Sequence, residues 1–407
     1  MIFVGNDWAE AHHDVWVMDD NGARLGYQRF PEGMTGVSGF HELVASFVSD
    51  PCEVVIGIET DRGLWVHALV AAGYQVYAIN PLSASRYRDR HRVSGAKSDR
   101  GDAKMLADLV RTDRHCHRRI AGDTPRVEAI KVLARTHQNL IWEKQRQVNR
   151  LRSTLREYYP AALETFGNLT DRDAIAVLAA APNPILGARL TIPQIRAALK
   201  RGGRQRNLEW RAVQIQEGLR QEHLEASELL TEGFGAATTA ILGVIAAIDV
   251  EIHKLEQALS TTLEQHPDAA IYLSMPGLAD VLGARILGEF GDDPNRYVNG
   301  KSRRNYAATS PLTIASGTSR TVIARYVRNN RLYDTALRWA FTSLTPSPGC
   351  RAFYDERRAK GDHHSQALRA LANRLVGILD GCLKHRTLYN EDTAWAHRQP
   401  VTETIAA

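Results

Sequence analysis

The feature that most constrains the fold is a short apolar run that ends in an acid. Residues 53–59 read Glu-Val-Val-Ile-Gly-Ile-Glu. An almost unbroken apolar run of this length is typical of a strand that is buried on both faces at the centre of a sheet. Glu59 directly follows the run, at a place where burial is expected and acids are rare. The run therefore predicts an α/β domain that carries an acid at the end of its central strand.

Strands and helices alternate around this run, from residue 1 to about residue 115. In chain order, we expect strands at Ile2–Ala9, His13–Met18 and Arg24–Phe30, a helix at Val37–Val48, the central strand at Glu53–Glu59, a helix at Leu64–Ala72 and a strand at Tyr74–Ile79. The turn residues Asp19–Gly22 favour an antiparallel meander for the first three strands. This order of elements is that of the ribonuclease H-like fold, which we predict by analogy.

The middle of the chain predicts long helices. Apolar residues recur at helical spacing among charged ones over Asp123–Tyr159, and a second helical tract covers Leu208–Gln265. In the second tract isoleucine and leucine recur at alternating steps of four and three, which favours a coiled-coil seam. A basic module lies between the two tracts, with a short helix that begins at Thr191-Ile192-Pro193-Gln194 and ends at Gly202-Gly203. Its sequence leaves open whether it binds nucleic acid or only connects the tracts.

The length of 407 residues exceeds what one hydrophobic core usually supports. We expect a ribonuclease H-like domain at 1–120, a helical coiled-coil region at 121–266, a mainly α-helical domain at 267–390 that closes with a helix at Ser365–Lys384, and a tail at 391–407. The four cysteines have no paired spacing, and we find neither a charged leader nor an apolar stretch of membrane-spanning length. We therefore expect a cytoplasmic, nucleoid-associated protein with no membrane partner.

Four acids of the first region stand where a metal site needs them: Asp7, Glu59, Asp99 and Asp102. The first two end strands, and the last two lie one turn apart on one face of a helix. Converging carboxylates repel one another unless a divalent cation compensates them, and Mg²⁺ prefers such oxygen ligands. Two such ions would clamp the attacking and the leaving oxygen of a phosphodiester. The alternative is that each acid only caps or solvates its own element.

Positive charge surrounds two of these acids. Residues 86–119 hold eleven Lys and Arg, among them Lys97, Arg100 and Lys104, and the whole chain has a net charge of +5. This surplus favours contact with nucleic-acid phosphates, although a charge run also forms plain solvated surface. The histidine clusters match no zinc spacing and are expected on the solvated surface. These clusters are His12-His13, His115-Cys116-His117 and His363-His364.

Seven short segments at the two ends of the chain carry a family resemblance. Near the N-terminus they are Gly5-Asn6-Asp7-Trp8-Ala9, Ile58-Glu59-Thr60-Asp61-Arg62-Gly63 and Lys97-Ser98-Asp99-Arg100-Gly101-Asp102-Ala103. In the C-terminal third they are Ser274–Leu278, Gly288–Asp292, Tyr306–Gly317 and Arg351–Tyr354. In these segments the chain resembles the DEDD-type insertion-sequence transposases of the one-hundred-and-ten family, and the middle of the chain diverges.

The resemblance implies a RuvC-like N-terminal domain, which is of the ribonuclease H-like kind. It implies that Asp7, Glu59, Asp99 and Asp102 form a catalytic tetrad that binds Mg²⁺ or Mn²⁺. It also implies that residues 267–390 are a transposase domain with a nucleophilic serine, which here is Ser316 of the pair Ser316-Gly317.

Such an enzyme would exchange DNA strands through a covalent phosphoserine link. The resemblance further implies a structured guide RNA, the bridge RNA, that pairs with donor and target DNA, and a homo-oligomer, either a dimer or a tetramer. Arg320, Arg325 and Arg328 are near the serine in sequence, and we expect them to stabilise charge on the phosphate.

Other interpretations stay open on the residues alone. A Ser-Gly pair is most often only a turn, and Ser302, Ser310 and Ser319 compete with Ser316 as nucleophile. A junction-resolving endonuclease would need the acids and no serine, and a nucleic-acid-binding scaffold would need neither. An actin-like ATPase or sugar kinase would need glycine-rich phosphate loops, which we do not find in the sequence.

Overall fold

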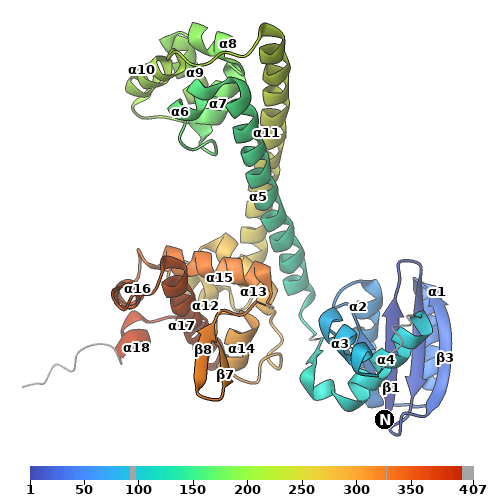
Figure 1. Cartoon of the computed structure of the whole chain (residues 1–407). Helices are drawn as coiled ribbons and strands as arrows, with labels where there is room; N and C mark the ends of the chain where they lie inside the picture. Colours follow the sequence, from blue (N-terminus) through green and yellow to red (C-terminus); the bar gives the residue numbers. More distant parts are fainter. Residues whose placement is uncertain (92–97, 121, 327, 397–407) are drawn as a thin grey trace, which may run out of the picture. The chain divides into compact units, whose positions relative to one another are not determined.

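The structure, a computed structural model, describes residues 1–91, 98–120, 122–326 and 328–396. It divides into two compact units (Figure 1). Unit 1 consists of Met1–Thr124 with Asp292–Val298, and unit 2 consists of Pro125–Gly291 with the residues from Asn299 onwards. Lys97, which we predicted to contact nucleic acid, lies outside the described residues.

Unit 1 is built on a six-stranded mixed sheet with the order β3-β2-β1-β4-β5-β6. Its strands are β1 (Ile2–Trp8), β2 (His12–Met18), β3 (Arg24–Pro31), β4 (Val54–Ile58), β5 (Gln75–Ala78) and β6 (Arg118–Arg119). The first three strands form the antiparallel meander that the turn residues predict, while β4 pairs in parallel with β1 and β5. All five residues of β4 are buried, which confirms the central strand.

Helices cover both faces of this sheet. They are α1 (Met34–Ala45), α2 (Leu64–Ala71), α3 (Pro81–His91) and α4 (Asp99–Thr112), with the 3-10 turns η1 (Pro51–Glu53) and η2 (Arg114–Cys116). One face packs Val4 and Ile56 against Phe40 of α1 and Trp65 of α2. The other face packs against α4. Helix α1 begins three residues before its predicted start because Gly33, with a φ of 99°, ends the extended chain there.

Two glycines let α4 lie directly on the sheet. Gly5 of β1 and Gly57 of β4 are neighbours in the sheet, and both face α4. A Cβ atom at Gly5 would lie 1.8 Å from the carbonyl oxygen of Ala103, and one at Gly57 would lie 2.6 Å from that of Leu106. Any side chain at either position would push the helix away from the strands. The glycines therefore hold α4, which carries two of the predicted acids, close to β1 and β4.

The described part of unit 2 is helical with one β-hairpin. The long helices α5 (Pro125–Tyr158) and α11 (Glu228–Glu264) run side by side (Figure 1). Between them in sequence lie α6 (Pro160–Thr165), α7 (Arg172–Ala180), α8 (Pro184–Arg189), α9 (Ile192–Arg201) and α10 (Leu208–Leu219). After α11 come α12 (Ala269–Ser274), α13 (Asp280–Phe290), α14 (Gly300–Tyr306), the hairpin of β7 (Leu312–Ser316) and β8 (Ser319–Ile323), α15 (Asn330–Ser343), α16 (Pro348–Ala359), α17 (His364–His385) and α18 (Glu391–Trp395).

The structure corrects three expectations in this unit. The tract predicted at Leu208–Gln265 is two helices, because residues 220–227 interrupt it and α11 begins only at Glu228. The tail predicted from residue 391 begins with the helix α18. Its Trp395 is buried, and the centroid of the Trp395 ring lies 5.9 Å from that of Phe353. A membrane-length apolar stretch does exist: α11 has a mean hydropathy of 1.7 over an 18-residue window. Of that window 28% is buried, and Ile241 and Ile245 of α11 share a core with Leu151 of α5.

Candidate functional site

Three elements bring the predicted acids to one end of the sheet in unit 1. Side chains of a strand alternate between its two faces, so Asp7 of β1 lies on the face that α4 covers. Glu59 directly follows β4, which pairs in parallel with β1. Helix α4 begins at Asp99 behind its N-cap Ser98, whose side chain accepts a hydrogen bond from Gly101 N–H. Asp102, one turn later, is only 4% exposed.

The electrostatics of Asp7 reflect this arrangement. Burial and, in decreasing order, the negative charges of Asp102, Glu59, Asp99 and Asp14 raise the pKa of Asp7 from 3.8 to about 6. Charges act on a pKa over short distances, so the four carboxylates that add to the effect of burial lie near Asp7. Among the largest contributions that the described residues make to this pKa, none comes from a cation that would compensate the charge of Asp7, which is the electrostatic condition of a cation site.

Two arginines compensate the neighbouring acids. Arg88 of α3 donates to Asp102 Oδ1 from Nε at 3.1 Å and from a terminal nitrogen at 2.9 Å. Arg29 of β3 lies 2.9 Å from Asp99 and binds both carboxylate oxygens of Asp14 at 2.8 to 3.1 Å. Burial would raise the pKa of Asp14, but hydrogen bonds from Arg29 and Tyr27 lower it below its usual value.

Sequence reasoning missed Asp14 and both arginines. One signal was available for Asp14, because it occupies a position of β2 whose period-two neighbours Trp16 and Met18 are core residues. No comparable signal exists for Arg29, which meets its acids only through the fold. Arg88 belongs to the basic run at 86–119, but nothing in that run indicates that it pairs with Asp102.

A second acidic cluster lies beside the first. One ligand atom from each of His12, Asp14 and Asp99 lies within 4.8 Å of the others, so these side chains also have the donor set of a metal site. The charge of Asp14 is already compensated by Arg29, whereas that of Asp7 is not. An added cation would therefore gain more at Asp7 than at Asp14.

The histidine next to this cluster contradicts the expected surface position. His13 is fully buried, and its ring stacks on that of Trp65 with 3.7 Å between the centroids. It also lies within hydrogen-bonding distance of Asn6 at 3.2 Å and of Glu32 at 2.5 Å. Because β2 alternates, His13 points to the face opposite Asp14 and fills the core under α2.

Exposed cations of α4 stand close to the acids. Arg100 and Lys104 lie 5.4 Å and 5.8 Å from the centroid of the Trp16 ring, and Arg100 also lies 5.2 Å from that of Tyr27. These contacts leave their charged ends at the surface of unit 1. Both residues were predicted to bind nucleic acid, and their role stays a prediction.

The predicted serine lies in unit 2, at the tip of the β7–β8 hairpin. Ser316 pairs with Ser319 across a two-residue turn in which Gly317 has a φ of 54°. All ten residues of the two strands are exposed, so the hydroxyl of Ser316 is accessible. The sequence prediction of a mainly α-helical domain missed this hairpin. Arg320 pairs with Ala315, which places it on the face of the hairpin opposite Ser316.

The other predicted groups near the serine have partners of their own. Arg325 donates to Asn305 Oδ1 at 3.2 Å, and the guanidinium of Arg328 lies 3.7 Å from the ring centroid of Tyr333. Of the competing serines, Ser310 donates to Asn373 Oδ1 at 3.4 Å and Ser302 to Asn299 Oδ1 at 3.2 Å. Ser316 and Ser319 are therefore the two serines that stand free at the hairpin tip.

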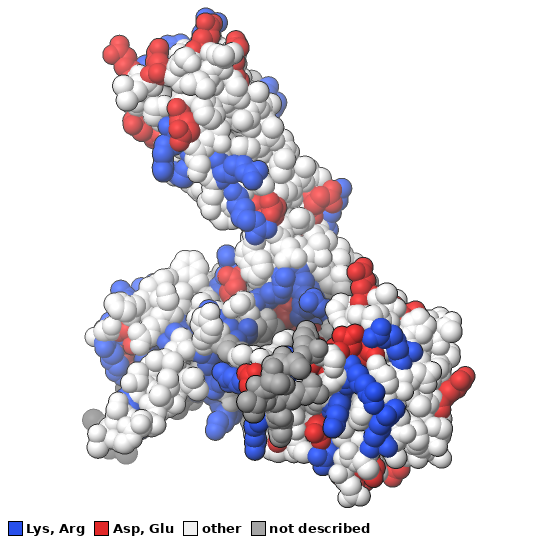
Figure 2. Space-filling model, turned by 45° about the vertical axis from the view of Figure 1, so that its right-hand side comes forward, with Lys and Arg blue, Asp and Glu red and all other residues white. Residues whose placement is uncertain are grey.

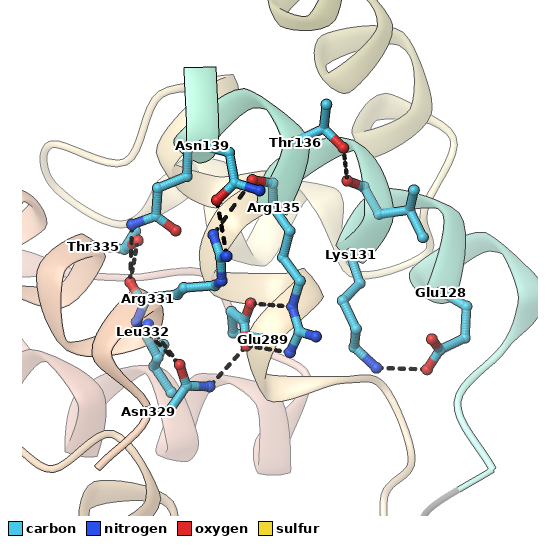
Figure 3. A network of polar contacts seen from close by, with 12 residues as sticks. Glu128, Lys131, Arg135, Thr136, Asn139, Glu289, Asn329, Arg331, Leu332 and Thr335 are labelled. Carbon is cyan, nitrogen blue, oxygen red and sulfur yellow. Dashed lines mark hydrogen bonds and ion pairs between the residues drawn. The ribbon is translucent and has the colours of Figure 1, made fainter. Parts of the chain in front are cut away.

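A buried ion-pair network fixes the chain just after the hairpin (Figure 3). Glu289 of α13, 4% exposed, accepts two hydrogen bonds from Arg135 of α5 at 2.7 and 3.0 Å and one from Asn329 at 2.7 Å. Asn329 is the N-cap of α15. Burial would raise the pKa of Glu289, but Arg135 lowers it below its usual value. The network thus joins α5, α13 and the segment through which β8 continues into α15.

Comparisons with known proteins match both ends of the chain. A family model described as "Transposase" matches residues 4–160, and one described as "Transposase IS116/IS110/IS902 family" matches residues 269–355. The chain is 42% identical over 400 residues to the "Mini-circle putative transposase for IS117" of Streptomyces coelicolor, covering 97% of each protein. It is 26% identical to an uncharacterized 42 kDa protein of the insertion element IS900 from Mycobacterium paratuberculosis, over 97% of this chain and 98% of that protein.

Proposed function

Because the chain belongs to the IS116/IS110/IS902 family of transposases, we propose that it cuts and rejoins DNA with two groups of its own, the acids around Asp7 and the hydroxyl of Ser316. The family makes the chain an enzyme of transposition that acts on DNA. The roles of the individual residues are our proposal. So is the assignment of unit 1, by its strand order, to the RuvC-like ribonuclease H fold.

The observation that carries the proposal is the raised pKa of Asp7. Burial and four neighbouring carboxylates all disfavour its negative charge, and no cation of the described residues is among the largest contributions to this pKa. Such a site is costly for an apo protein and is best explained by a cation that binds there during function.

We propose that Asp7, Glu59, Asp99 and Asp102 hold Mg²⁺ or Mn²⁺. All four are oxygen donors, as hard divalent ions require, and Asp102 and Asp99 would exchange their arginine partners for the ion. A bound ion would stabilise negative charge on a scissile phosphodiester. The exposed cations Arg100 and Lys104 would hold the DNA backbone beside it.

The serine would act as nucleophile. Its Oγ forms a bond to phosphorus while the bond from phosphorus to the oxygen of the departing strand breaks, the serine proton goes to a base and the departing oxygen takes up a proton. Rejoining reverses these steps with the hydroxyl of a new strand and frees the serine. One phosphodiester is exchanged for another, so no high-energy cofactor is consumed. Arg325 and Arg328 are the cations we assign to the charge of this phosphate; Arg320, which we also expected there, lies on the opposite face of the hairpin.

Further elements of the proposal concern partners. We propose that a structured bridge RNA selects donor and target DNA, that α5 and α11 form a coiled coil, and that the protein works as a dimer or tetramer at the nucleoid. The long, partly exposed helix pair supports an assembly of this kind, since its apolar residues Val244 and Val250 face solvent in the single chain.

A covalent-adduct assay tests the chemistry. The protein is incubated with labelled DNA of its element, the transcribed flanking RNA and Mg²⁺, and the products are separated on a denaturing gel. We expect Ser316→Ala to abolish the slow-migrating protein–DNA adduct and Ser319→Ala, its neighbour across the turn, to keep it. An adduct that persists in Ser316→Ala would exclude this nucleophile. Metal-dependent cutting that continues without an adduct would instead favour a junction-resolving endonuclease.

A further inference from the structure

The helices between α5 and α11 form a module of which all but the first residue lies outside both family matches. We call residues 160–219, which comprise α6 to α10, the helical module; the family models match residues 4–160 and 269–355. Phe166, Leu178, Ile195 and Ile215 are buried in a core that it shares with α5 and α11. It is therefore a folded part of unit 2, and the chemistry proposed above assigns it no task.

One stretch of the module concentrates positive charge. Residues 189–211 hold seven Lys and Arg and one acid, hence a net charge of +6, compared with +5 for the whole chain. Three of these cations have acidic neighbours: Arg196 lies 2.8 Å from Glu209, and Arg204 and Arg211 lie 2.6 Å and 3.6 Å from Asp173. The other four are exposed and make no ion pair within the described part of the chain. They are Arg189, Lys200, Arg201 and Arg206.

Most of this unpaired charge gathers at the turn between α9 and α10. Lys200 and Arg201 end α9, and Arg206 lies two residues before α10. Arg172, also exposed, lies against the same turn, because a Cβ at Gly203 would be 3.6 Å from one of its terminal nitrogens. We call these four residues the cationic turn. Figure 2 shows Lys and Arg side chains gathered on part of the surface of the module, apart from most of its acids.

An exposed aromatic ring stands next to this charge. Trp210 lies in the first turn of α10, four residues after Arg206 in sequence, and is 61% exposed. A single exposed tryptophan is ordinary on a protein surface. Proteins that bind single-stranded nucleic acid, however, combine exposed cations with aromatic side chains on which the bases stack. The cations attract phosphates, and the indole offers a face on which a base stacks whatever its sequence.

We propose that the cationic turn and Trp210 bind a single-stranded segment of nucleic acid, with phosphates at the four cations and a base on the indole. Gly203 is exposed, and its φ of 90° favours glycine, so no side chain covers the backbone at this point of the turn. The proposal does not depend on Ser316 or on the metal site, because binding needs neither of them. The shared chemistry is a phosphodiester strand, which either an RNA loop or unpaired DNA supplies.

Binding by the full-length protein tests this inference. The affinities for fluorescent 20-mers of oligo-U, oligo-dT and a mixed-sequence duplex are measured by anisotropy in EDTA, from 50 to 300 mM NaCl. Each phosphate contact contributes about 0.7 to the slope of log K against log salt for single strands. We expect the triple variant Lys200→Ala, Arg201→Ala, Arg206→Ala to lower the magnitude of that slope by about 2. A preference for oligo-U would identify RNA as the source, and a preference for oligo-dT unpaired DNA.

A matched control removes three other cations. Arg146, Lys254 and Lys360 have side chains exposed by 65%, 64% and 62%, each pairs with an acid on its own helix, and their triple alanine variant should leave the slope unchanged. We expect Trp210→Ala to weaken single-strand binding by about 5- to 150-fold, Trp210→Phe to retain most of it, and neither to change duplex binding. Equal salt slopes for the two triple variants would overturn the proposal. It would also be overturned if the Lys200→Ala, Arg201→Ala, Arg206→Ala variant bound the oligonucleotides like the wild type but no longer bound vesicles of anionic lipid. An adduct that persists in Ser316→Ala would overturn the serine chemistry alone, because oligonucleotide binding in EDTA does not depend on it.

Discussion

The most direct consequence of the site is that wild-type unit 1 is destabilised by its own carboxylates when no metal is bound. The pKa of Asp7 is raised from its ordinary value of 3.8 to about 6 in the folded chain. A group whose folded pKa is raised contributes stability below its unfolded pKa and loses it as the pH rises through the folded pKa. The repulsion is therefore absent near pH 4 and fully present above about pH 6. Asp7→Asn removes the charge at every pH.

The size of the effect follows from the shift. For a group fully shielded from solvent, the rise in the pKa of Asp7 would lower the free energy of unfolding by about 3 kcal/mol. Because Asp7 is partly exposed, we expect a loss of about 1 to 2 kcal/mol. In EDTA at pH 8 we expect Asp7→Asn to raise the Tm of unit 1 by about 3 to 8 °C. The gain should fall to about half at pH 5 and nearly vanish at pH 4.

The assay is thermal unfolding followed by fluorescence from pH 4 to 8, with and without Mg²⁺. Mg²⁺ at about 100 times its Kd stabilises a folded site by about 2.7 kcal/mol, so it should raise the Tm of the wild type and not that of Asp7→Asn. Glu10→Gln, which removes an exposed acid from the β1–β2 turn, is the control and should change the Tm little. A lower Tm for Asp7→Asn at pH 8, or equal protection of both proteins by Mg²⁺, would refute the reasoning.

Three further outcomes follow from the packing. Gly57→Ala forces a Cβ to within 2.6 Å of a helix carbonyl and should destabilise unit 1 by about 1 to 3 kcal/mol in thermal unfolding, whereas Gly243→Ala, with nothing within 4 Å, should not destabilise. Arg88→Gln frees Asp102 and should tighten Mn²⁺ binding measured by calorimetry; the exposed Arg86→Gln should not. Glu289→Gln should cost unit 2 about 3 kcal/mol at pH 7 in urea unfolding. Because the pKa of Glu289 is lowered, that difference should shrink as the pH falls through its folded pKa.

Local patterns of the sequence predict unit 1 well and unit 2 less well, for a physical reason. The strands of unit 1 are short runs with period two, and Val54–Ile58 is apolar throughout, so burial alone identifies them. The β7–β8 hairpin has no buried residue among its ten, so no hydrophobic pattern marked it. Trp395 looked like part of a tail because its partner Phe353 lies far away in sequence.

In the candidate site, the acids at strand ends could be predicted from the sequence, whereas the partners of these acids could not, because the fold brings them together. An acid directly after a buried strand is conspicuous, and Asp7 and Glu59 could be named for that reason. The partners of the acids depend on the height of α4 above the sheet, which Gly5 and Gly57 set by leaving room for helix backbone. Two glycines on adjacent strands, each two residues before an acid, are therefore part of the site although they bind nothing. The proposed site requires Gly-x-Asp on β1 and Gly-x-Glu at the end of its parallel neighbour β4, because the helix must come close before the four carboxylates could share one cation.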